Sequence, residues 1–302
     1  MTVQASTPQP ITIVVASDNF YAVLIAPLLK SIEMNHTGGE ALEFVIIDDG
    51  ISAANRAKLQ RTINPATSTL QWVKSADAFA HNIKIPVDKT AFPAAAYLRL
   101  YAPYIIAPER EKVLYLDCDM IVQADIAALW HTDLGNRLFG AVQDLQGTVS
   151  CSWGGIPNHQ ELGIPADSKY FNSGLLLINA RKWREENTTT KVIQCLIDNS
   201  KYVNWPDQYG LNAALANQWL ELDPRWNWYA SLPDTTPAGD APFILHFLDV
   251  KPVFTSYASN PGFQEEFYRY MRLTPWKDHR PVSDYRRIIR KTYNKIKKMF
   301  IR

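Results

Sequence analysis

Two carboxylates placed two residues apart give this sequence its clearest chemical signal. Asp117 and Asp119 flank Cys118 at the end of the apolar run VLYL. Carboxylate oxygens are hard ligands that suit Mn²⁺ or Mg²⁺ and leave room for the oxygens of a diphosphate. An Asp-x-Asp pattern alone often marks only a polar strand end or turn. Here the apolar residues on both sides predict burial, and buried carboxylates need partners such as a metal ion.

A histidine and a lysine near the C-terminal end could extend this chemistry. His246 follows a second apolar run, FIL, and could be a hydrogen-bonded core residue or a third metal ligand. As a ligand, its imidazole would favour Mn²⁺ over Mg²⁺. Lys251 could reach a phosphate as a point charge or be an ordinary surface lysine.

Four further polar residues have both a structural and a functional interpretation. Arg99 lies in the apolar segment 94–106, where it could be salt-bridged or could extend its head to solvent. Asp207 and Gln208 open a predicted helix, where an aspartate commonly serves as the cap. Asn172 precedes Ser-Gly and could be a turn residue. None of the four identifies a site by itself.

The elements that would position these residues alternate between strands and helices. Apolar runs predict strands over 11–16, 43–48, 69–73, 113–116, 169–179 and 243–245. Helical patterns are predicted over 21–32, 54–63, 94–106, 181–199 and 206–218. This alternation predicts a parallel, doubly wound sheet, in which ligands bind beyond the carboxyl ends of the strands.

Composition restricts the class of protein. The 302 residues are 47% hydrophobic and 20% charged, a balance typical of globular domains rather than of disordered or fibrous chains. No apolar run approaches the ~18 residues that span a bilayer, and the first residues lack the basic region of a secretory signal. Three widely spaced cysteines form neither a disulfide framework nor a zinc signature. We therefore expect a cytoplasmic protein.

The charge is unevenly distributed along the chain. The net charge is +1, yet residues 286–302 hold eight of the 31 basic residues and no acidic one. The other 285 residues carry 23 basic and 30 acidic side chains, a net charge of −7. An acidic body excludes a nucleic-acid-binding protein that uses its whole surface. The basic tail predicts a local attachment device.

The same tail has the spacing of an amphipathic helix. From residue 285 on, apolar residues recur every three or four positions: Tyr285, Ile288, Ile289, Tyr293, Ile296, Met299 and Phe300. This stripe could pack on the protein's own core, or it could lie on the anionic inner leaflet of a membrane, where each basic residue contributes on the order of 1 kcal/mol. We predict a catalytic domain over 1–265 and a C-terminal helical segment over 266–302 whose basic tail, 285–302, associates peripherally with the membrane.

Seven segments resemble glycosyltransferase family 8 in their order along the chain, particularly its bacterial lipopolysaccharide and lipooligosaccharide α-galactosyl- and α-glucosyltransferases. They are ASDNFYA (16–22), YLRL (97–100), LYLDCDMIV (114–122), GAVQDL (140–145), YFNSGLLLIN (170–179), PDQYGLN (206–212) and HFLDVKP (246–252). The resemblance implies an α/β nucleotide-diphospho-sugar transferase (GT-A) fold, a Rossmann-like mixed sheet flanked by helices. It also implies retaining, Mn²⁺-dependent transfer of galactose or glucose from a UDP-hexose to a saccharide or glycolipid acceptor, in the synthesis of lipopolysaccharide or another cell-surface glycan.

The resemblance also implies roles for individual residues at the nucleotide and the metal. Contacts to the uridine and ribose fall on Ala16, Ser17 and Asp18, with Tyr21 near the base. Mn²⁺ binding falls on Asp117, Asp119 and His246. Lys251 would lie by the diphosphate.

At the sugars, the resemblance assigns five further side chains. Arg99 would touch the donor sugar and its phosphate, and Asn172 and Asp207 would contact the donor sugar. Gln208 would lie against the reacting face of the anomeric carbon. Asp144 matches a carboxylate on the acceptor side.

Two segments depart from the family pattern. The family's usual His-x-x-Gly-x-x-Lys-Pro-Trp is one residue shorter here, with Asp249 in place of Gly and Val253 in place of Trp. A carboxylate beside a diphosphate would repel it unless it points away. The segment before Arg99 lacks polar acceptor contacts, so we expect a different acceptor.

Two alternatives to a glycosyltransferase remain open from the sequence. The altered loop is also compatible with a non-catalytic sugar-nucleotide-binding or assembly protein at the membrane. A nucleotidyltransferase is disfavoured because the segment SDNFYAV contains neither the glycine nor the lysine of a phosphate loop.

Overall fold

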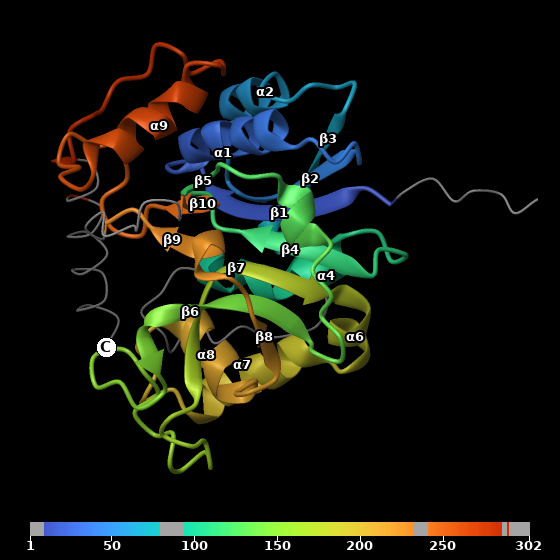
Figure 1. Ribbon diagram of the computed structural model, residues 1–302, viewed down its shortest axis with the longest axis vertical. Helices are drawn as coiled ribbons and strands as arrows, with labels where there is room; N and C mark the ends of the chain where they lie inside the picture. Colours follow the sequence, from blue (N-terminus) through green and yellow to red (C-terminus); the bar gives the residue numbers. More distant parts are fainter. Residues whose placement is uncertain (1–8, 79–93, 232–240, 286–288, 290–302) are drawn as a thin grey trace, which may run out of the picture.

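A seven-stranded sheet forms the centre of the molecule. The computed structural model describes residues 9–78, 94–231, 241–285 and 289 (Figure 1). The strands of the sheet are β1 (Ile11–Asp18), β2 (Leu42–Asp49), β3 (Ser68–Lys74), β4 (Lys112–Leu116), β6 (Phe139–Thr148), β7 (Lys169–Asn179) and β8 (Trp219–Glu221). Their spatial order is β3-β2-β1-β4-β7-β6-β8.

One strand of the sheet, β7, runs antiparallel to its neighbours, and the other pairings are parallel, including that of β6 with β8. Strands β1 to β4 run parallel, and their near-continuous apolar sequences, such as FVII in β2, suit burial on both faces. Strand β7 runs antiparallel to both β4 and β6. The uniformly parallel sheet expected from the alternation of elements is therefore wrong for β7, because β6 and β7 are joined by a loop and no helix crosses between them. The mixed sheet implied by the family resemblance is confirmed.

Helices cover both faces of this sheet. They are α1 (Ala22–Asn35), α2 (Ala53–Gln60), α3 (Ser75–Ala78), the 3₁₀ helix η1 (Ala94–Tyr101), α4 (Ala102–Ile105), α5 (Ile126–Trp130), α6 (Ala180–Glu185), α7 (Thr188–Asp198), α8 (Pro206–Ala214), the 3₁₀ helix η2 (Pro224–Asn227) and α9 (Pro261–Met271). Figure 1 shows α1, α2 and α9 grouped on one side of β1 and β4, and α6, α7 and α8 on the other.

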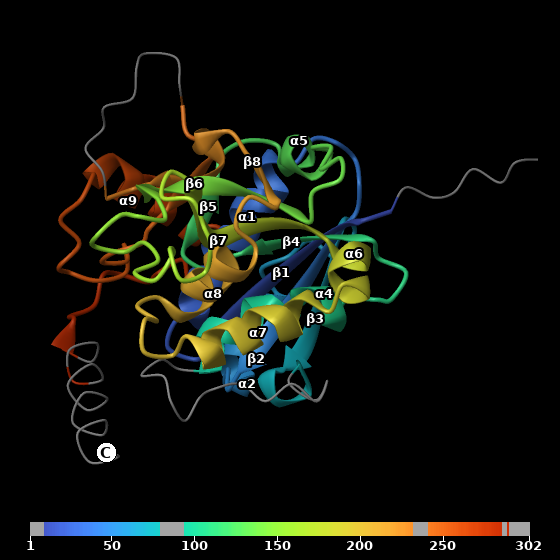
Figure 2. The same ribbon diagram turned by 90° about the horizontal axis from the view of Figure 1, so that it is seen from below.

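Alternating side chains of the central strands build two hydrophobic cores. In β1, Ile13 and Val15 pack in the core that also holds residues of α1 and α9, whereas Val14 packs in the core of η1, α7 and α8. Strands β1 and β4 lie side by side in the middle of the molecule (Figure 2). The carboxyl ends of these two strands therefore meet at one edge of the sheet, between the two cores.

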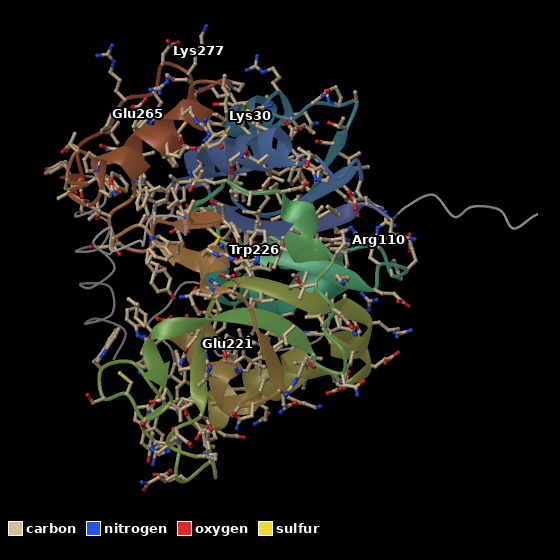
Figure 3. All side chains as sticks on the ribbon, viewed as in Figure 1. Lys30, Arg110, Glu221, Trp226, Glu265 and Lys277 are labelled. Atoms are coloured by element: carbon tan, nitrogen blue, oxygen red, sulfur yellow. The ribbon has the colours of Figure 1, made fainter. Side chains whose placement is uncertain are left out.

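A small second sheet lies beside this edge. It consists of β5 (Met120–Val122), β10 (Ile244–His246) and β9 (Trp228–Tyr229), in the order β5-β10-β9. β10 pairs antiparallel with β5, and His246 lies opposite Met120. This pairing joins the C-terminal part of the chain to the segment that follows β4. Trp226, which precedes β9, lies inside the body of the molecule (Figure 3).

Two predicted helices differ from the structure. The helix predicted over 181–199 is two helices, α6 and α7, because Asn187 adopts the left-handed conformation (φ 52°) that ends a helical run. The segment 94–106 is mostly the 3₁₀ helix η1, followed by the short α4. Helix α8 begins at Pro206 as predicted, since proline suits the first turn, but it ends at Ala214, before residue 218.

The C-terminal part of the described chain packs against the N-terminal part. Phe267 and Met271 of α9 lie in the same core as α1, and residue 265, where we placed a domain boundary, lies inside α9. Most of the predicted tail helix, 286–288 and 290–302, lies outside the described residues. Among the described residues, none of the helices is long and apolar enough to cross a membrane.

Candidate active site

Two strand pairings bring the three predicted metal ligands together. Asp117 follows β4, and its N–H donates to the carbonyl of Gly174 on β7 at 2.8 Å. Asp119 precedes β5, and its carbonyl accepts the N–H of Phe247, the residue after β10, at 2.9 Å. This hydrogen bond places His246 beside the Asp-x-Asp segment, although 127 positions separate it from Asp119 in the sequence.

The three side chains form a compact group. One ligand atom from each of Asp117, Asp119 and His246 lies within 4.8 Å of the others. The Nε2 of His246 is 3.4 Å from Asp119 Oδ1 and 3.8 Å from Asp117 Oδ2. This buried nitrogen has no hydrogen-bond partner in the described part of the chain. Two carboxylates and one imidazole are a donor set that suits Mn²⁺.

A hydrogen bond on the far side of the ring defines the histidine tautomer. The Nδ1 of His246 lies 2.8 Å from Asn227 Oδ1, and the side-chain nitrogen of Asn227 donates to Asn172. The amide oxygen of Asn227 therefore faces the imidazole, so Nδ1 carries the proton in this hydrogen-bond network. The lone pair of Nε2 then points at the carboxylates, as a metal ligand requires.

A glycine makes room for the group. A Cβ atom at Gly174 would lie 2.5 Å from His246 Cε1 and 2.8 Å from Asp117 Oδ2. Neither neighbour could move without disturbing the ligand arrangement. The close approach of β7 to His246 and Asp117 therefore requires glycine here. The unpartnered Nε2 of His246 and the close packing of Gly174 against the ligand side chains both fit a divalent cation held by Asp117, Asp119 and His246.

Two partly buried cations balance the carboxylates. Arg99 Nη2 lies 3.1 Å from Asp117 Oδ1, and its Nε lies 2.8 Å from Asp207 Oδ2. Lys251 Nζ lies 2.5 Å from Asp119 Oδ2 and also donates to the carbonyls of Phe247 and Leu248. Lys251 is thus inside the charge cluster and is not an ordinary surface lysine, although its loop departs from the family pattern.

These charges shift the ionisation of the carboxyl groups in opposite directions. Burial raises the pKa of Asp119, but the charge of Lys251, together with the nearby His246, outweighs burial and holds that pKa well below its usual range. Burial also raises the pKa of Asp117, and burial together with the neighbouring charge of Asp119 outweighs the lowering by Arg99. Burial lowers the pKa of Arg99, but Asp117 and Asp207 outweigh burial and raise it. Asp119 and Arg99 are therefore charged in the folded protein.

A chain of side-chain amides connects the metal ligands to Asp144. Asn172 accepts hydrogen bonds from Asn227 Nδ2 and from the N–H of Gly174, both at 2.9 Å. The Nδ2 of Asn172 donates to Asp144 Oδ2 at 2.9 Å, and Gln208 Nε2 donates to the same oxygen at 2.9 Å. Each amide is oriented by the next, so the position of one group depends on the others.

Helix α8 is fixed on β7 so that its first turn faces the same place. Asn212 of α8 bonds the backbone N–H and carbonyl of Phe171, each at 2.9 Å. At the start of the helix, Ser173 N–H donates to Gln208 Oε1 at 3.1 Å, and Ser173 Oγ donates to Asp207 Oδ2 at 3.0 Å. Asp207 and Gln208 therefore turn toward β7, and neither side chain caps the helix.

The residues expected at the nucleotide lie at the end of β1. Asp18 Oδ1 accepts the N–H groups of Phe20 at 2.9 Å and Tyr21 at 3.0 Å, and the buried Ser17 hydroxyl donates to the carbonyl of Asp18. Burial raises the pKa of Tyr21, and the charge of Lys251 opposes this rise. Ala16, Ser17, Asp18 and Tyr21 therefore flank the Lys251 side of the charge cluster.

A cavity of about 390 Å³ opens beside the metal ligands. Six of the sequence-predicted site residues line it: Arg99, Asp117, Asn172, Asp207, Gln208 and the acceptor-side Asp144. The cavity does not include Asp119, His246, Lys251 or the residues of β1 among its lining. The structure thus brings the sugar-contact candidates together in the lining of one cavity. Asp117 links this cavity to the other two candidate metal ligands, Asp119 and His246.

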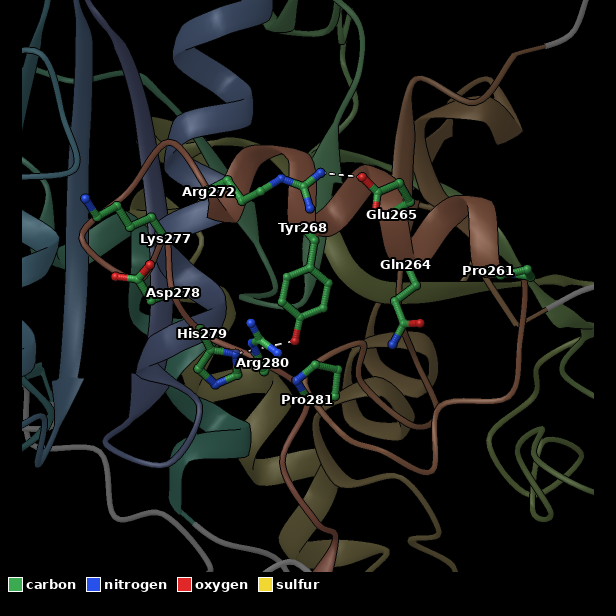
Figure 4. Close-up of a pocket in the computed structure, with 10 residues that line it drawn as sticks. All are labelled: Pro261, Gln264, Glu265, Tyr268, Arg272, Lys277, Asp278, His279, Arg280 and Pro281. Carbon is green, nitrogen blue, oxygen red and sulfur yellow. Dashed lines mark hydrogen bonds and ion pairs between the residues drawn. The ribbon is translucent and has the colours of Figure 1, made fainter.

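A second cavity, of about 450 Å³, lies between α9 and residues 277–281. Arg272 is ion-paired with Glu265 there, and the hydroxyl oxygen of Tyr268 lies 3.4 Å from His279 Nδ1 (Figure 4). None of its lining residues belongs to the segments that suggested chemistry in the sequence. We therefore place the candidate active site at the first cavity.

Three site residues escaped the sequence analysis. Ser173 and Gly174 stood inside the FNSG segment but were assigned no role. Asn227 was missed altogether, although a single amide between Trp226 and Trp228 is an unusual polar interruption. Because it contacts the histidine ring and not a substrate, only the three-dimensional pairing reveals it.

A sequence model described as "Glycosyl transferase family 8" matches residues 12–252. The chain belongs to this family. Family membership implies a sugar-nucleotide donor, an acceptor and, with the Asp-Asp-His group, a divalent metal.

Named relatives agree with this assignment. The chain is 29% identical over 281 residues to general stress protein A of Bacillus subtilis, covering 87% of this chain and 94% of that protein. It is 25% identical over 198 residues to the lipopolysaccharide 1,2-glucosyltransferase of Escherichia coli K12, covering 62% of this chain and 56% of that one. It also spans 63% of glycosyltransferase GlyB of Streptococcus pneumoniae, at 26% identity.

Solved structures confirm the fold. The galactosyltransferase LgtC, in complex with donor and acceptor sugar analogs, superposes with a TM-score of 0.71 at 27% identity, covering 88% of this chain and 96% of that one. The bifunctional glycosyltransferase WbbM superposes with a TM-score of 0.72 over 91% of this chain and 51% of that one, at 22% identity. The fold is therefore that of the GT-A glycosyltransferases, as the sequence motifs predicted.

Proposed function

We propose that this glycosyltransferase moves a hexose, galactose or glucose, from a UDP-hexose to a saccharide hydroxyl with retention of configuration. The observation that carries the proposal is the Asp117–Asp119–His246 group, with its orphaned Nε2, at the edge of a cavity lined by polar sugar-contact candidates. A divalent ion held there, Mn²⁺ in preference to Mg²⁺, would neutralise charge on the departing diphosphate as a Lewis acid.

The protein's own cations would support the leaving group. Arg99 is partly buried and fixed by two carboxylates, so its charge is oriented before a substrate arrives. Lys251 is held by Asp119 and by two carbonyl groups in the same way. Fixed charges need no reorganisation during the reaction, which makes them effective at a site where negative charge develops.

The geometry favours attack on the same face as the leaving group. Gln208 is an amide and a poor nucleophile. Asp207 Oδ2 is ion-paired with Arg99 and accepts a hydrogen bond from Ser173, so this oxygen is not free to attack the anomeric carbon. In the proposed step the acceptor oxygen bonds to the anomeric carbon while the bond to the β-phosphate oxygen breaks. The proton of the acceptor hydroxyl passes to that phosphate oxygen. Gln208 would lie against the oxocarbenium-like carbon, and Asp144 would bind an acceptor hydroxyl.

The decisive experiment is release of UDP from UDP-galactose and UDP-glucose with Mn²⁺, with and without a saccharide acceptor, followed by NMR of the product. The expected result is acceptor-stimulated UDP release and an α-linked product. UDP-sugar binding without release or transfer would instead support a non-catalytic sugar-nucleotide-binding protein.

We also propose that the basic tail, 285–302, holds the enzyme at the anionic inner face of the membrane, where a glycolipid acceptor of lipopolysaccharide or other surface-glycan synthesis would be found. The support is the concentration of basic residues after 285, against an acidic body. Tyr285 and Ile289, apolar residues of the tail that the structure describes, are both exposed, which also supports the proposal.

The tail can be removed without cutting into the described fold. Val282 is paired with Val253 and Thr255 through its backbone, and Asp284 accepts a hydrogen bond from Ser256. Deletion of 286–302 spares both contacts. We expect this truncation to retain activity on a soluble acceptor and to lose sedimentation with phosphatidylglycerol vesicles. Unchanged sedimentation would refute the membrane role.

A further inference from the structure

Large exposed apolar side chains gather at the mouth of the active-site cavity. Among the described residues, nine such side chains are exposed, and four of them line this one cavity. These four form what we call the apolar rim: Leu145, Trp153, Trp205 and Leu248, which are 51%, 63%, 51% and 38% exposed. Tryptophan is seldom this exposed on a folded protein, and a group of such residues marks a binding surface.

The turn that carries Trp153 is held by close backbone contacts. Gly155 N–H donates to the Cys151 carbonyl at 2.9 Å, and Ile156 N–H donates to the Val149 carbonyl at 2.7 Å. A Cβ at Gly155 would lie 2.2 Å from that Val149 oxygen, so the turn can be this tight only with glycine. Trp153 is therefore presented to solvent by an ordered turn.

One side chain ties the two tryptophans together. Asn204 Nδ2 donates to the Gly155 carbonyl at 3.1 Å, and Asn204 Oδ1 accepts the N–H of Trp205 at 2.8 Å. Asn204 thus connects the turn of Trp153 to the residue that precedes α8. Trp205 lies three positions before Gln208, so the rim is joined to the catalytic wall of the cavity.

The side chain of Gln146 lies in the same cavity as this rim, and its buried amide oxygen, Oε1, has no hydrogen-bond partner in the described part of the chain. A Cβ at Gly154, the neighbour of Trp153, would come within 2.6 Å of the Gln146 side chain. A buried, unsatisfied amide oxygen is costly in the free protein, and a ligand hydroxyl would satisfy it.

We infer that the apolar rim binds the pyranose ring of the acceptor, with Trp153 and Trp205 against its C–H face and Gln146 on a hydroxyl. This inference rests on the proposed function for naming that sugar the acceptor. Ring C–H groups carry slight positive charge and meet the negative face of an indole, and planar polar side chains bind the hydroxyls. A lipid chain would leave Gln146 unsatisfied, so the sugar is the better match.

The test measures binding without turnover. Methyl β-galactoside and methyl β-glucoside are titrated into the full chain with UDP and Mn²⁺, and saturation-transfer NMR follows the ring protons. The expected result is saturation of ring C–H protons and a dissociation constant raised about three- to ten-fold by Trp153→Ala or Trp205→Ala. Trp→Phe at each position should keep the affinity within about two-fold, because a ring face remains. Met34→Ala, a truncation of an exposed apolar residue on α1, should have no effect.

Each other outcome overturns the inference. Absence of glycoside binding, or an unchanged dissociation constant in both alanine variants, would show that the rim does not hold a sugar. Loss of phosphatidylglycerol-vesicle binding in these variants, with glycoside affinity intact, would make the rim a membrane contact.

The proposed function can fail separately from this inference. If UDP-hexose is not consumed while the alanine variants still weaken glycoside binding, the transfer reaction is wrong and the sugar site stands. If transfer occurs with the same acceptor KM in the alanine variants, the reaction stands and the sugar site is wrong.

Discussion

At the metal end of the cavity, polar side chains are buried and bonded to one another, whereas at its mouth large apolar side chains are exposed. His246 and Asn227 are 1% and 3% exposed, against 63% for Trp153. At the buried end, each group is oriented by its neighbour, from His246 through Asn227 and Asn172 to Asp144. The backbone that carries the two tryptophans is held by the turn around Trp153, by Asn204 and by the first turn of α8.

This difference indicates which positions tolerate substitution without loss of the proposed reaction. A buried polar network is strongly interdependent, so a substitution leaves a partner unsatisfied and affects several groups at once. An exposed side chain has few partners, so its replacement changes one contact. The metal end is therefore suited to a fixed reaction, and the rim is suited to selecting an acceptor.

The largest effect is expected from the metal ligands. Asp119→Asn removes a ligand and a unit of charge and leaves Lys251 without its carboxylate. We expect kcat/KM with Mn²⁺ to fall on the order of a thousand-fold, as expected for several kcal/mol of transition-state charge stabilisation. Circular dichroism and thermal unfolding check that the variant still folds. Asp167→Asn, the same change at an exposed carboxylate, should leave activity intact; near-normal activity of Asp119→Asn at limiting Mn²⁺ would contradict the metal assignment.

The second-largest effect is expected from Gln208, which lines the cavity between the candidate metal ligands and the apolar rim. Gln208→Ala removes the amide proposed to face the anomeric carbon, and we expect kcat to fall about a hundred-fold while the Kd for UDP changes less than about two-fold. Calorimetry with UDP and steady-state kinetics separate the two quantities. Gln60→Ala, on an exposed position of α2, is the control. A parallel loss of UDP affinity would assign Gln208 a structural role at the start of α8.

A third substitution tests whether the amide network acts on the metal. Asn227→Leu removes the acceptor of the His246 Nδ1 proton, so the ring loses the bond that fixes its tautomer. We expect the dissociation constant for Mn²⁺, measured by electron paramagnetic resonance of the free ion, to rise about 10- to 100-fold. Excess Mn²⁺ should restore turnover, which it would not do if the core had collapsed. Unchanged Mn²⁺ affinity would separate Asn227 from the metal site.

The same contrast explains what the sequence could predict. The candidate metal and sugar residues at the buried end stand in short segments such as LYLDCDMIV and YFNSGLLLIN, where polar groups interrupt apolar strands. The strand pattern placed Asp117 and Asp119 at a strand end, and the family resemblance grouped them with His246. The apolar pattern did not reveal that β7 runs antiparallel to its neighbours, because strand direction depends on a loop and not on periodicity.

The rim was beyond sequence reasoning for a physical reason. Trp153 and Trp205 stand in irregular segments, where no periodicity predicts which way a side chain points. A tryptophan is more often buried than exposed, so its type alone favours a core position. Only the described turn and the Asn204 bridge show that both rings border the cavity.

The smallest effect is expected from that bridge. Asn204→Ala removes the two hydrogen bonds that connect the turn of Trp153 to Trp205, while both rings remain. Since a net hydrogen bond contributes about 1 kcal/mol, and the bridge acts only through the position of the rings, we expect the acceptor KM to rise about two- to three-fold with kcat unchanged. Asn136→Ala, at an exposed position, controls for the loss of a surface amide. Steady-state kinetics with varied acceptor concentration measure KM and kcat separately. A rise in KM alone places Asn204 with the rim, whereas a fall in kcat alone would mean that the bridge positions Gln208 through α8, and the two ends of the cavity would then not be independent.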